Sequence, residues 1–314
     1  MNERRFMSYS FCFGPSGAGK SHLLRQIIIQ KAERSLASMG QDRTKYIVIV
    51  PEQYSMQTQR ELVQEQPSQV LMNIDVLSFG RLAHRVFEET GVDRRTVLND
   101  IGKSLLLRRV ASRCAKDLQI LQKGIHRPGM IDEVKSVLSE FMQYGIAEDQ
   151  IEEMAVYAAE HGQNALQARL RDLKTLYREF RRAEKDSYVT SEETLDLLAK
   201  AIPDAESLRG SVIVFDGFTG FTTVQYRVVM ALIRAASEVT FSFTVSGDGG
   251  PDIGVTAAGG SAGSEENLFY LSRRTVRDII RMASAEGFAR GEDLYIGLES
   301  RNRESRDRES AGQK

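Results

Sequence analysis

The chain has 314 residues, of which 41% are hydrophobic and 27% are charged, a composition typical of a soluble globular protein with one or two domains. A formal net charge of −1 excludes a uniformly basic nucleic-acid coat, so any nucleic-acid contact is a local patch. Two cysteines, Cys12 and Cys114, exclude a disulfide framework or a cysteine metal site, and no apolar run reaches membrane-spanning length, so we expect a cytoplasmic protein without membrane contact.

The first predicted strand, over 9–13, leads into a glycine-rich turn and then a helix. Residues 14–21 read GPSGAGKS, a G-x-x-x-x-G-K-[ST] match in the strand, loop and helix context that this motif needs. Lys20 would reach the β and γ phosphates of ATP, and the Ser21 hydroxyl would complete a Mg²⁺ shell. The alternative is a glycine-rich loop with an incidental lysine. The predicted ATP-binding residues of this loop are Gly14, Gly17, Ala18, Gly19, Lys20 and Ser21.

The next elements alternate between helices and strands. A helix is predicted over 23–39, with Gly40 as its C-cap, and a β-branched strand over 45–51. A helix over 55–64 and a strand over 70–77 follow, and Ser78 then caps a helix over 79–89. This alternation predicts an α/β fold with a parallel sheet.

From Leu98 to about Ala201 the pattern is helical, which predicts a helical insertion into the α/β layer. Its first half is basic and its second half is acidic. The basic residues are Lys103, Arg108, Arg109, Arg113, Lys116, Lys123 and Arg127. We predict that Arg108, Arg109 and Arg113 bind a DNA backbone, and the alternative is a solvated helix face.

A phosphate loop needs a partner acid at the tip of a neighbouring strand. Asp216, at the end of an apolar strand over 211–218, is the best candidate, and Ser21 and Asp216 are the predicted metal residues. The alternative is a turn-forming aspartate in an Asp-Gly pair. Hydrolytic motors commonly carry a glutamate at the position of Gly217, so we expect little hydrolysis unless Gln53, Gln225 or a partner protein supplies a base.

A helix over 222–236, a strand over 238–245, a glycine-rich loop over 247–263 and a helix over 267–285 complete the predicted elements. The polar stretch 299–314 is expected to be unfolded. The predicted domains are a first part of the P-loop lobe at 1–95, the helical insertion at 96–205, a second part of the lobe at 206–290 and a polar tail at 291–314.

Four segments together resemble the amino-terminal part of AddB, the B subunit of the bacterial AddAB helicase-nuclease. They are the phosphate loop at 14–21, VPEQY at 50–54, VLSFGRL at 76–82 and FDGFTGFT at 215–222. The resemblance covers about residues 7 to 245 and implies a superfamily 1 helicase-like first lobe with a helical insertion. It also implies a role in double-strand break repair and recombination, a partner A subunit that drives translocation, and single-stranded or end-exposed DNA as a ligand.

The resemblance places Gln53 and Tyr54 where helicase lobes touch the DNA backbone or stack on a base. The alternative is that Tyr54 packs on the helical insertion. The family's longer chain also has a second lobe, a nuclease domain and cysteines for an iron–sulfur cluster, and none of these maps onto this sequence. We therefore expect an amino-terminal fragment that binds ATP as a degenerate motor, with no nuclease chemistry of its own and an iron–sulfur cluster only in the full-length protein.

Two other functions are compatible with a phosphate loop. A P-loop kinase for a small molecule would use the helical block as a lid and would need several arginines at the phosphates. A structural ATP-binding protein would use the nucleotide only to stabilise its fold.

Overall fold

The computed structural model describes residues 8–37, 44–66, 73–92, 95–125, 127, 129–185, 188–245 and 268–297. These residues form two compact units. The described residues of 1–90, 199–221 and 226–314 form the sheet unit, and those of 91–198 and 222–225 form the helical unit.

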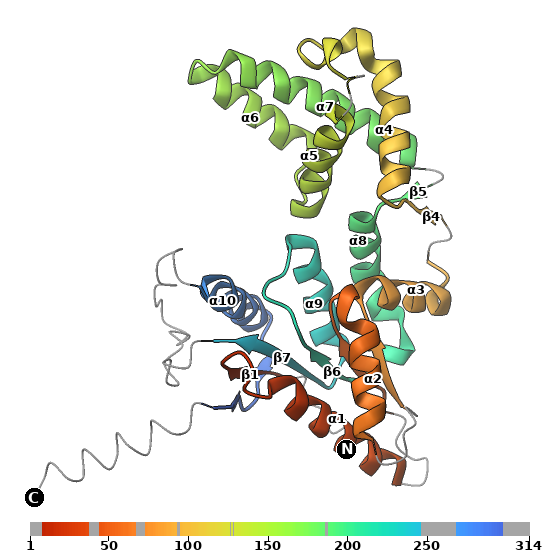
Figure 1. Cartoon of the computed structure of the whole chain (residues 1–314), viewed down its shortest axis with the longest axis vertical. Helices are drawn as coiled ribbons and strands as arrows, with labels where there is room; N and C mark the ends of the chain where they lie inside the picture. Colours follow the sequence, from red (N-terminus) through yellow and green to blue (C-terminus); the bar gives the residue numbers. More distant parts are fainter. Residues whose placement is uncertain are drawn as a thin grey trace, which may run out of the picture. The chain divides into compact units, whose positions relative to one another are not determined.

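The sheet unit contains a seven-stranded parallel sheet in the order β3-β2-β6-β7-β1-β8, with β9 also paired to β1 (Figure 1). The strands are β1 (Ser8–Gly14), β2 (Tyr46–Ile49), β3 (Ile74–Leu77), β6 (Val212–Phe215), β7 (Glu238–Thr244), β8 (Ala289–Arg290) and β9 (Leu294–Tyr295). Every ladder between them is parallel. The α/β fold predicted from the alternating elements is therefore confirmed.

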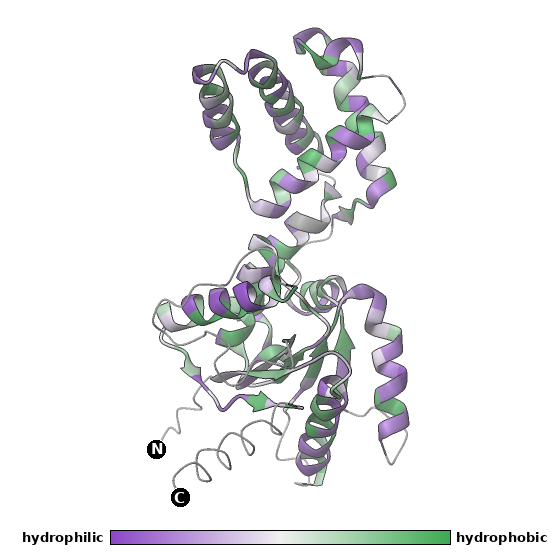
Figure 2. Ribbon diagram, turned by 60° about the vertical axis from the view of Figure 1, so that its left-hand side comes forward, coloured by the Kyte–Doolittle hydropathy of each residue, from purple (hydrophilic) through white to green (hydrophobic). Residues whose placement is uncertain are grey.

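Helices cover both faces of this sheet, as a parallel sheet requires. The helices are α1 (Lys20–Ala37), α2 (Ser55–Glu65), α3 (Phe79–Thr90), α9 (Thr223–Ala235) and α10 (Tyr270–Ala285). On one face, Leu24 and Ile28 of α1 and Leu62 of α2 pack with Val48 and Val214 of the strands. On the other face lie α3, α9 and α10 (Figure 1). Figure 2 shows that the strands are mostly hydrophobic, whereas the helices are hydrophilic on their outer sides.

Aromatic rings fill the α9 side of the central strands. The rings of Phe215 on β6 and Phe241 on β7 stack with centroids 4.9 Å apart. Phe11 on β1 lies 5.8 Å from Phe241, so three adjacent strands share one aromatic layer. Phe79 at the start of α3 approaches Phe215 at 6.1 Å and joins the helix to that layer. These contacts add to the apolar burial that stabilises the sheet.

The helical unit packs four long helices around its own apolar core. They are α4 (Asp100–Cys114), α5 (Met130–Tyr144), α6 (Glu148–Glu160) and α7 (Asn164–Glu184). Leu107, Leu138, Ile151 and Leu176 are at most 1% exposed at the centre of this core. A short parallel pair, β4 (Thr96–Val97) and β5 (Tyr188–Val189), also belongs to the unit, and α8 (Ser191–Ala201) follows it. The unit is therefore not entirely helical, in contrast to the prediction.

Most predicted elements are present, with shifted ends. The strand predicted over 211–218 ends at Phe215, because the ladder with β2 and β7 stops there. Ser78 caps α3 as predicted, since its Oγ accepts a hydrogen bond from the Arg81 N–H at 3.3 Å. Gly40, residues 70–72, the loop 247–263 and the segment 299–314 lie outside the described residues.

Strands β8 and β9 were not predicted, and β9 lies within the segment 291–314 that the sequence assigned to a polar tail. Each has two residues, too few to carry a periodicity that could be recognised. The Ile296 N–H donates to the Phe13 carbonyl at 2.8 Å, which seats this segment against β1. Among the helices in the described part of the chain, none is long and apolar enough to cross a bilayer.

A buried carboxyl group lies at the end of α7. Glu184 is 1% exposed, and its Oε1 accepts from Nη1 of Arg181 at 2.6 Å. Its Oε2 has no hydrogen-bond partner among the described residues. Burial raises the pKa of Glu184 to about 7, Glu193 acts in the same direction, and Arg181 and Lys103 oppose the increase.

We predict that Glu184 makes the helical unit less stable as the pH rises. The ordinary pKa of 4.5 applies to the unfolded chain, so the native state binds more protons between pH 4.5 and about 7. Its contribution to the free energy of unfolding therefore falls by roughly 3 kcal/mol across this range and is constant above it. Urea denaturation at pH 5 and pH 8 should show a smaller difference for Glu184→Gln than for the wild type. The exposed Glu160→Gln is the control, and an unchanged pH dependence in Glu184→Gln would contradict the assignment.

Candidate functional site

The glycine-rich loop joins the end of β1 to the start of α1. Gly17 and Gly19 have φ values of 77° and 88°, which L-residues with a side chain rarely adopt. The Ala18 N–H donates to the Pro15 carbonyl at 3.3 Å, and the Leu23 N–H donates to the Gly19 carbonyl at 2.9 Å. The loop therefore turns sharply into the helix, as the glycine spacing predicts.

Several backbone N–H groups of this loop have no acceptor among the described residues. Within the part of the chain that the structure describes, the N–H groups of Gly17, Gly19, Lys20 and Ser21 make no backbone or side-chain hydrogen bond. Lys20 and Ser21 belong to the first turn of α1, where such groups have no partner within the helix. Unpaired N–H groups at the N-terminus of an 18-residue helix create a positive potential suited to an anion.

Lys20 is the buried cation of the loop, with 8% of its surface exposed. Its Nζ donates to the Gly14 carbonyl at 3.0 Å and to the Pro15 carbonyl at 2.8 Å. Burial lowers the pKa of Lys20, while Cys12 and Asp216 act to raise it. A lysine that is held by carbonyls and partly desolvated can exchange those carbonyls for a stronger anionic partner.

Asp216 follows β6 directly, and its N–H donates to the Ile49 carbonyl at 3.0 Å. Its carboxylate acts on the pKa of both Lys20 and Cys12, so the structure brings the predicted acid into the neighbourhood of the phosphate loop. The prediction of a neighbouring strand is wrong, because β7 lies between β1 and β6. Both acid and loop still meet at the same edge, since all these strands are parallel and share their carboxyl ends.

Cys12 lies on β1 beneath this site and is fully buried. Burial raises the pKa of its thiol to about 11, Asp216 acts in the same direction, and Lys20 opposes the increase. The thiol is therefore protonated at neutral pH and unreactive, and Cys12 packs as a small buried hydrophobic residue. The described residues include no cluster of histidine, cysteine, aspartate and glutamate that could hold a metal on its own.

Gly217 adopts φ 78°, a conformation that costs a residue with a side chain about 1–2 kcal/mol. A Cβ at this position would lie 3.5 Å from both Pro51 and Tyr54, which is ordinary van der Waals contact. The backbone, and not a lack of space, thus disfavours a glutamate after Asp216.

The two glutamines named as alternative bases differ in their surroundings. Gln225 is engaged at the start of α9: its Oε1 accepts from the Thr222 N–H at 3.0 Å, and its N–H donates to Thr222 Oγ1 at 3.3 Å. This reciprocal pair is a capping box, so the side chain is not available for proton transfer. Gln53 is exposed in the turn Glu52–Tyr54 that follows β2.

The VPEQY and FDGFTGFT segments follow adjacent strands, β2 and β6, and their turns meet. The contact between Tyr54 and the position of Gly217 joins them, and Tyr54 remains 45% exposed. The VLSFGRL segment includes the end of β3, the next strand, and Gly80 lies near the Glu52 carboxylate. Three separate sequence segments therefore gather at one edge of the sheet.

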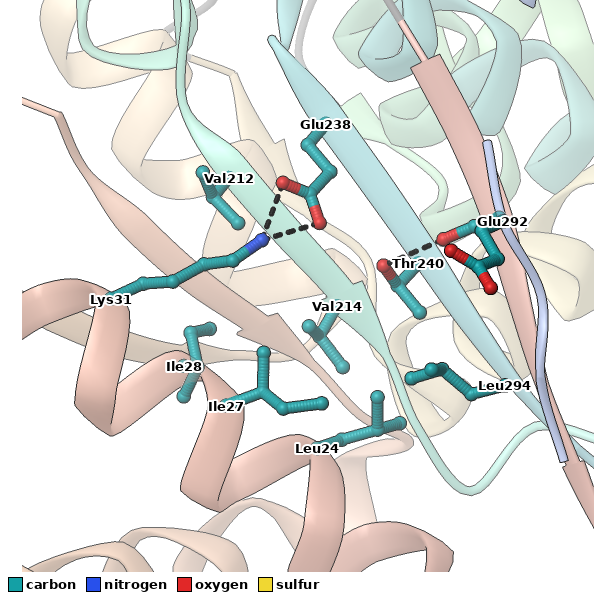
Figure 3. Close-up of a pocket in the computed structure, with 11 residues that line it drawn as sticks. Leu24, Ile27, Ile28, Lys31, Val212, Val214, Glu238, Thr240, Glu292 and Leu294 are labelled. Carbon is teal, nitrogen blue, oxygen red and sulfur yellow. Dashed lines mark hydrogen bonds and ion pairs between the residues drawn. The ribbon is translucent and has the colours of Figure 1, made fainter. Parts of the chain in front are cut away.

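A hollow of about 210 Å³ lies between α1 and the sheet, as Figure 3 shows. Val212 and Glu238, the first residues of β6 and β7, line it, so it lies toward the amino ends of these strands, away from the phosphate loop. Lys31 points into it, and its Nζ donates to both oxygens of Glu238 at 2.5 and 2.6 Å. Its cation is thus already neutralised, and this hollow is not an anion site.

The predicted DNA residues lie on α4, in the helical unit. Arg108, Arg109 and Arg113 are all exposed, and none of them forms an ion pair within the described ranges. Lys103, which the sequence counted in the same basic half, is instead buried at 4% exposure. Helical spacing alone could not show which basic residues face the core. We call Arg108, Arg109 and Arg113 the α4 basic face.

Comparison with known proteins identifies the family. The family model described as "ADDB, N-terminal" matches residues 11–309. The chain belongs to this family. It is 37% identical over 277 residues to the B subunit of the ATP-dependent helicase/deoxyribonuclease of Lachnoclostridium phytofermentans, covering 88% of this chain and 23% of that protein. It is 34% identical over 241 residues to the protein of the same name from Bacillus subtilis, covering 76% of this chain and 20% of that protein. The chain thus spans between a fifth and a quarter of the length of these relatives.

The structure also shows a neighbour of the phosphate loop that the sequence did not reveal. Gly14 is buried, and a Cβ there would lie 2.7 Å from the Ile296 carbonyl oxygen, inside any permitted contact. A Cβ added at Gly297 would lie 3.5 Å from the Ala18 Cβ and 3.6 Å from the ring of Pro15. The segment after β9 therefore forms one wall of the loop.

We predict that Gly14→Ala destabilises the sheet unit by about 1–3 kcal/mol, because backbone of the segment after β9 must move to admit the methyl group. Urea denaturation measures this change. The control is Ser16→Ala, which alters an exposed residue of the same loop. If the two variants were equally stable, the segment after β9 would be able to move away from the added methyl group without a loss of stability.

Proposed function

We propose that this chain is the ATP-binding, DNA-handling lobe of the B subunit of an ATP-dependent helicase/exonuclease that acts in double-strand break repair and recombination. The lobe is helicase-like, and an AddA-like helicase/nuclease protein is its partner in a heterodimer. The relatives are named as the B subunit of an ATP-dependent helicase/deoxyribonuclease, and this name supports the assignment. Family membership also favours it over a free-standing small-molecule kinase.

One observation carries the nucleotide part of the proposal. Unpaired backbone N–H groups of the loop, the buried Lys20 ammonium and the Asp216 carboxylate gather at one edge of the sheet. Mg-ATP would supply a triphosphate and a divalent cation. Lys20 and the loop N–H groups would bind the phosphates, while Ser21 and Asp216 would hold the metal.

The proposal assigns this site to binding rather than to hydrolysis. Gly217 offers no carboxylate, its φ of 78° disfavours one, and Gln225 is occupied by helix capping. A site without a positioned base loses several orders of magnitude in rate. The proposal gives this chain no nuclease chemistry of its own.

We predict that Lys20→Ala lowers the affinity for Mg-ATP at least about tenfold, equivalent to roughly 1.4 kcal/mol. Calorimetric titration measures this loss, and the exposed Lys200→Ala is the control. DNA-stimulated phosphate release should be close to background in the wild type. Robust turnover would disprove the degenerate motor but not ATP binding, whereas unchanged affinity in Lys20→Ala would disprove the site. If nucleotide only stabilised the fold, Lys20→Ala would lower thermal stability in the presence of ATP without a change in DNA binding.

The α4 basic face supports the DNA part of the proposal, together with Gln53 and Tyr54 at the edge of the sheet. Exposed arginines without ion pairs can neutralise backbone phosphates at little cost. Tyr54, at 45% exposure, has a ring face that a base could stack on.

We predict that replacing Arg108, Arg109 and Arg113 by glutamine weakens salt-dependent binding of single-stranded DNA. The slope of log affinity against log salt should become shallower by about 2, since each phosphate contact contributes roughly 0.7. Fluorescence anisotropy with labelled dT20 measures both quantities.

A triple variant of α7 and its C-cap, Arg171→Gln, Arg178→Gln and Lys185→Gln, is the matched control because it removes the same charge from exposed positions of the same unit. Arg171 and Arg178 already pair with Glu152 and Glu179, so their loss should change the slope little. An equal effect of both triple variants would indicate a general field and not the α4 basic face.

A further inference from the structure

The helical unit contains a basic hollow, which brings Lys123 and Arg127 of the basic half together with Arg169 of α7. It has a volume of about 280 Å³ and lies between the loop that follows α4, the start of α5 and the first half of α7. Three of its lining residues are cationic: Lys123 from the loop, Arg127 from the same connection and Arg169 from α7. We call these three residues the Lys123 pocket.

A buried carboxylate holds this loop in place. Asp172, one turn after Arg169 on α7, is 2% exposed. Its Oδ1 accepts from the Gln119 N–H, and its Oδ2 accepts from the N–H groups of Ile120 and Leu121, all at 2.8 Å. Three charge-assisted hydrogen bonds fix the loop on the helix that carries Arg169. The walls of the hollow are therefore preorganised and do not have to be ordered by a ligand.

The turn that joins Lys123 to Arg127 is also hydrogen-bonded. The Gly124 N–H donates to the Leu121 carbonyl at 3.0 Å, and the Arg127 N–H donates to the Gly124 carbonyl at 2.8 Å. The turn that carries Lys123 and Arg127 is thus held by its own backbone hydrogen bonds.

The charges in the hollow do not cancel. Oε2 of Glu133 lies 3.8 Å from Nη2 of Arg169, so this carboxylate offsets the charge of Arg169. Asp172 keeps its charge, but it is 2% exposed and does not line the hollow. Lys123 and Arg127 form no ion pair within the described ranges, so two positive charges remain. The hollow therefore suits an anion because of these two side chains, since the N-terminus of the adjoining helix α5 is already complemented by Asp132 and Glu133 in its first turn.

The rest of the lining suits a nucleotide unit and not a bare ion. Ile120, which is 45% exposed, and Met130 border the hollow and offer apolar contact beside the cations. A sugar or base joined to a phosphate presents this combination of charge and apolar surface. A backbone phosphate of single-stranded DNA, with its sugar, matches both features.

We propose that the Lys123 pocket binds one backbone phosphate of the single-stranded DNA that the α4 basic face contacts. This inference rests on the proposed DNA-handling function and extends it to a second position in the helical unit. The chain runs from Arg113 at the end of α4 through the turn Ala115–Asp117 into the pocket loop, so the two sites follow one another along the sequence. Lys123 and Arg127 bind the phosphate, and Arg169 orients it from α7.

The test is the binding of labelled dT20 to the full chain between 50 and 200 mM salt, measured by fluorescence anisotropy. The double variant Lys123→Gln with Arg127→Gln should bind about three- to tenfold more weakly at low salt. Its slope of log affinity against log salt should be shallower by about 0.7, the loss of one phosphate contact. Both residues are exposed, so the variant should keep the wild-type circular dichroism spectrum and melting temperature.

Two further variants make the test specific. Lys185→Gln removes an exposed lysine elsewhere in the same unit and should leave the slope unchanged. Arg169→Lys keeps the charge but loses the guanidinium fork, so it should bind more tightly than Arg169→Gln and less tightly than the wild type.

The outcomes separate this inference from the function on which it rests. A wild-type slope in the pocket variant, with a reduced slope in the α4 triple variant, would overturn the Lys123 pocket and leave DNA handling intact. An absence of dT20 binding by the wild-type chain would overturn both. Inorganic phosphate at 10 mM, at constant ionic strength, should displace dT20 only weakly. Strong displacement that disappears in the pocket variant would show a free-phosphate site and overturn the DNA assignment.

Discussion

The pairing of β7 with β1 on one side and with β6 on the other is the constraint on which the nucleotide site depends. Through the register of Gly14 with Thr244 and of Phe215 with Phe241, this strand sets the distance between the phosphate loop and Asp216. Strands β1 and β6 do not pair with each other in the sheet. The packed rings of Phe11, Phe215 and Phe241 hold the same three strands from the α9 side, so apolar packing and the ladder hydrogen bonds act together.

Much of this arrangement could be predicted from the sequence. The β-branched runs indicated buried parallel strands, and the spacing of Gly14, Gly19 and Lys20 predicted a phosphate loop between a strand and a helix. Asp216 was recognised because an apolar run ends at it. The common property of these features is that each is local, since a few consecutive residues determine the backbone that they form.

The features that the sequence did not predict depend on contacts between distant residues. Strand order placed β7 between β1 and β6, and residue type alone gives no order. Lys103 is basic like Arg108 but is buried, where its charge acts to lower the pKa of Glu184. The residue type of Gln225 does not show that its side chain caps α9, because this role depends on the contact with Thr222. Strand β9 was too short to recognise, although it brings Ile296 beside Gly14.

The helical unit uses charge in two different ways. Asp172 and Glu184 are buried on α7, one satisfied by three N–H groups and the other raised in pKa by its surroundings. These carboxylates act on the fold, because they fix a loop or make stability depend on pH. The arginines of the α4 basic face and the Lys123 pocket stay at the surface and remain available to a ligand. A count of charges along the sequence does not distinguish these buried charges from the exposed ones.

The strand order also has a consequence for how the chain is made. β1 is synthesised first, yet its partner β7 begins at Glu238, and β8 and β9 follow later still. At about 5–20 residues per second, a ribosome needs roughly 10–50 seconds to supply that partner. During this interval Tyr9, Phe11 and Phe13 have no strand to pair with and no aromatic layer to join. The nascent chain therefore carries an unpaired aromatic strand until β7 has been made, and during this interval it is open to aggregation and to capture by chaperones.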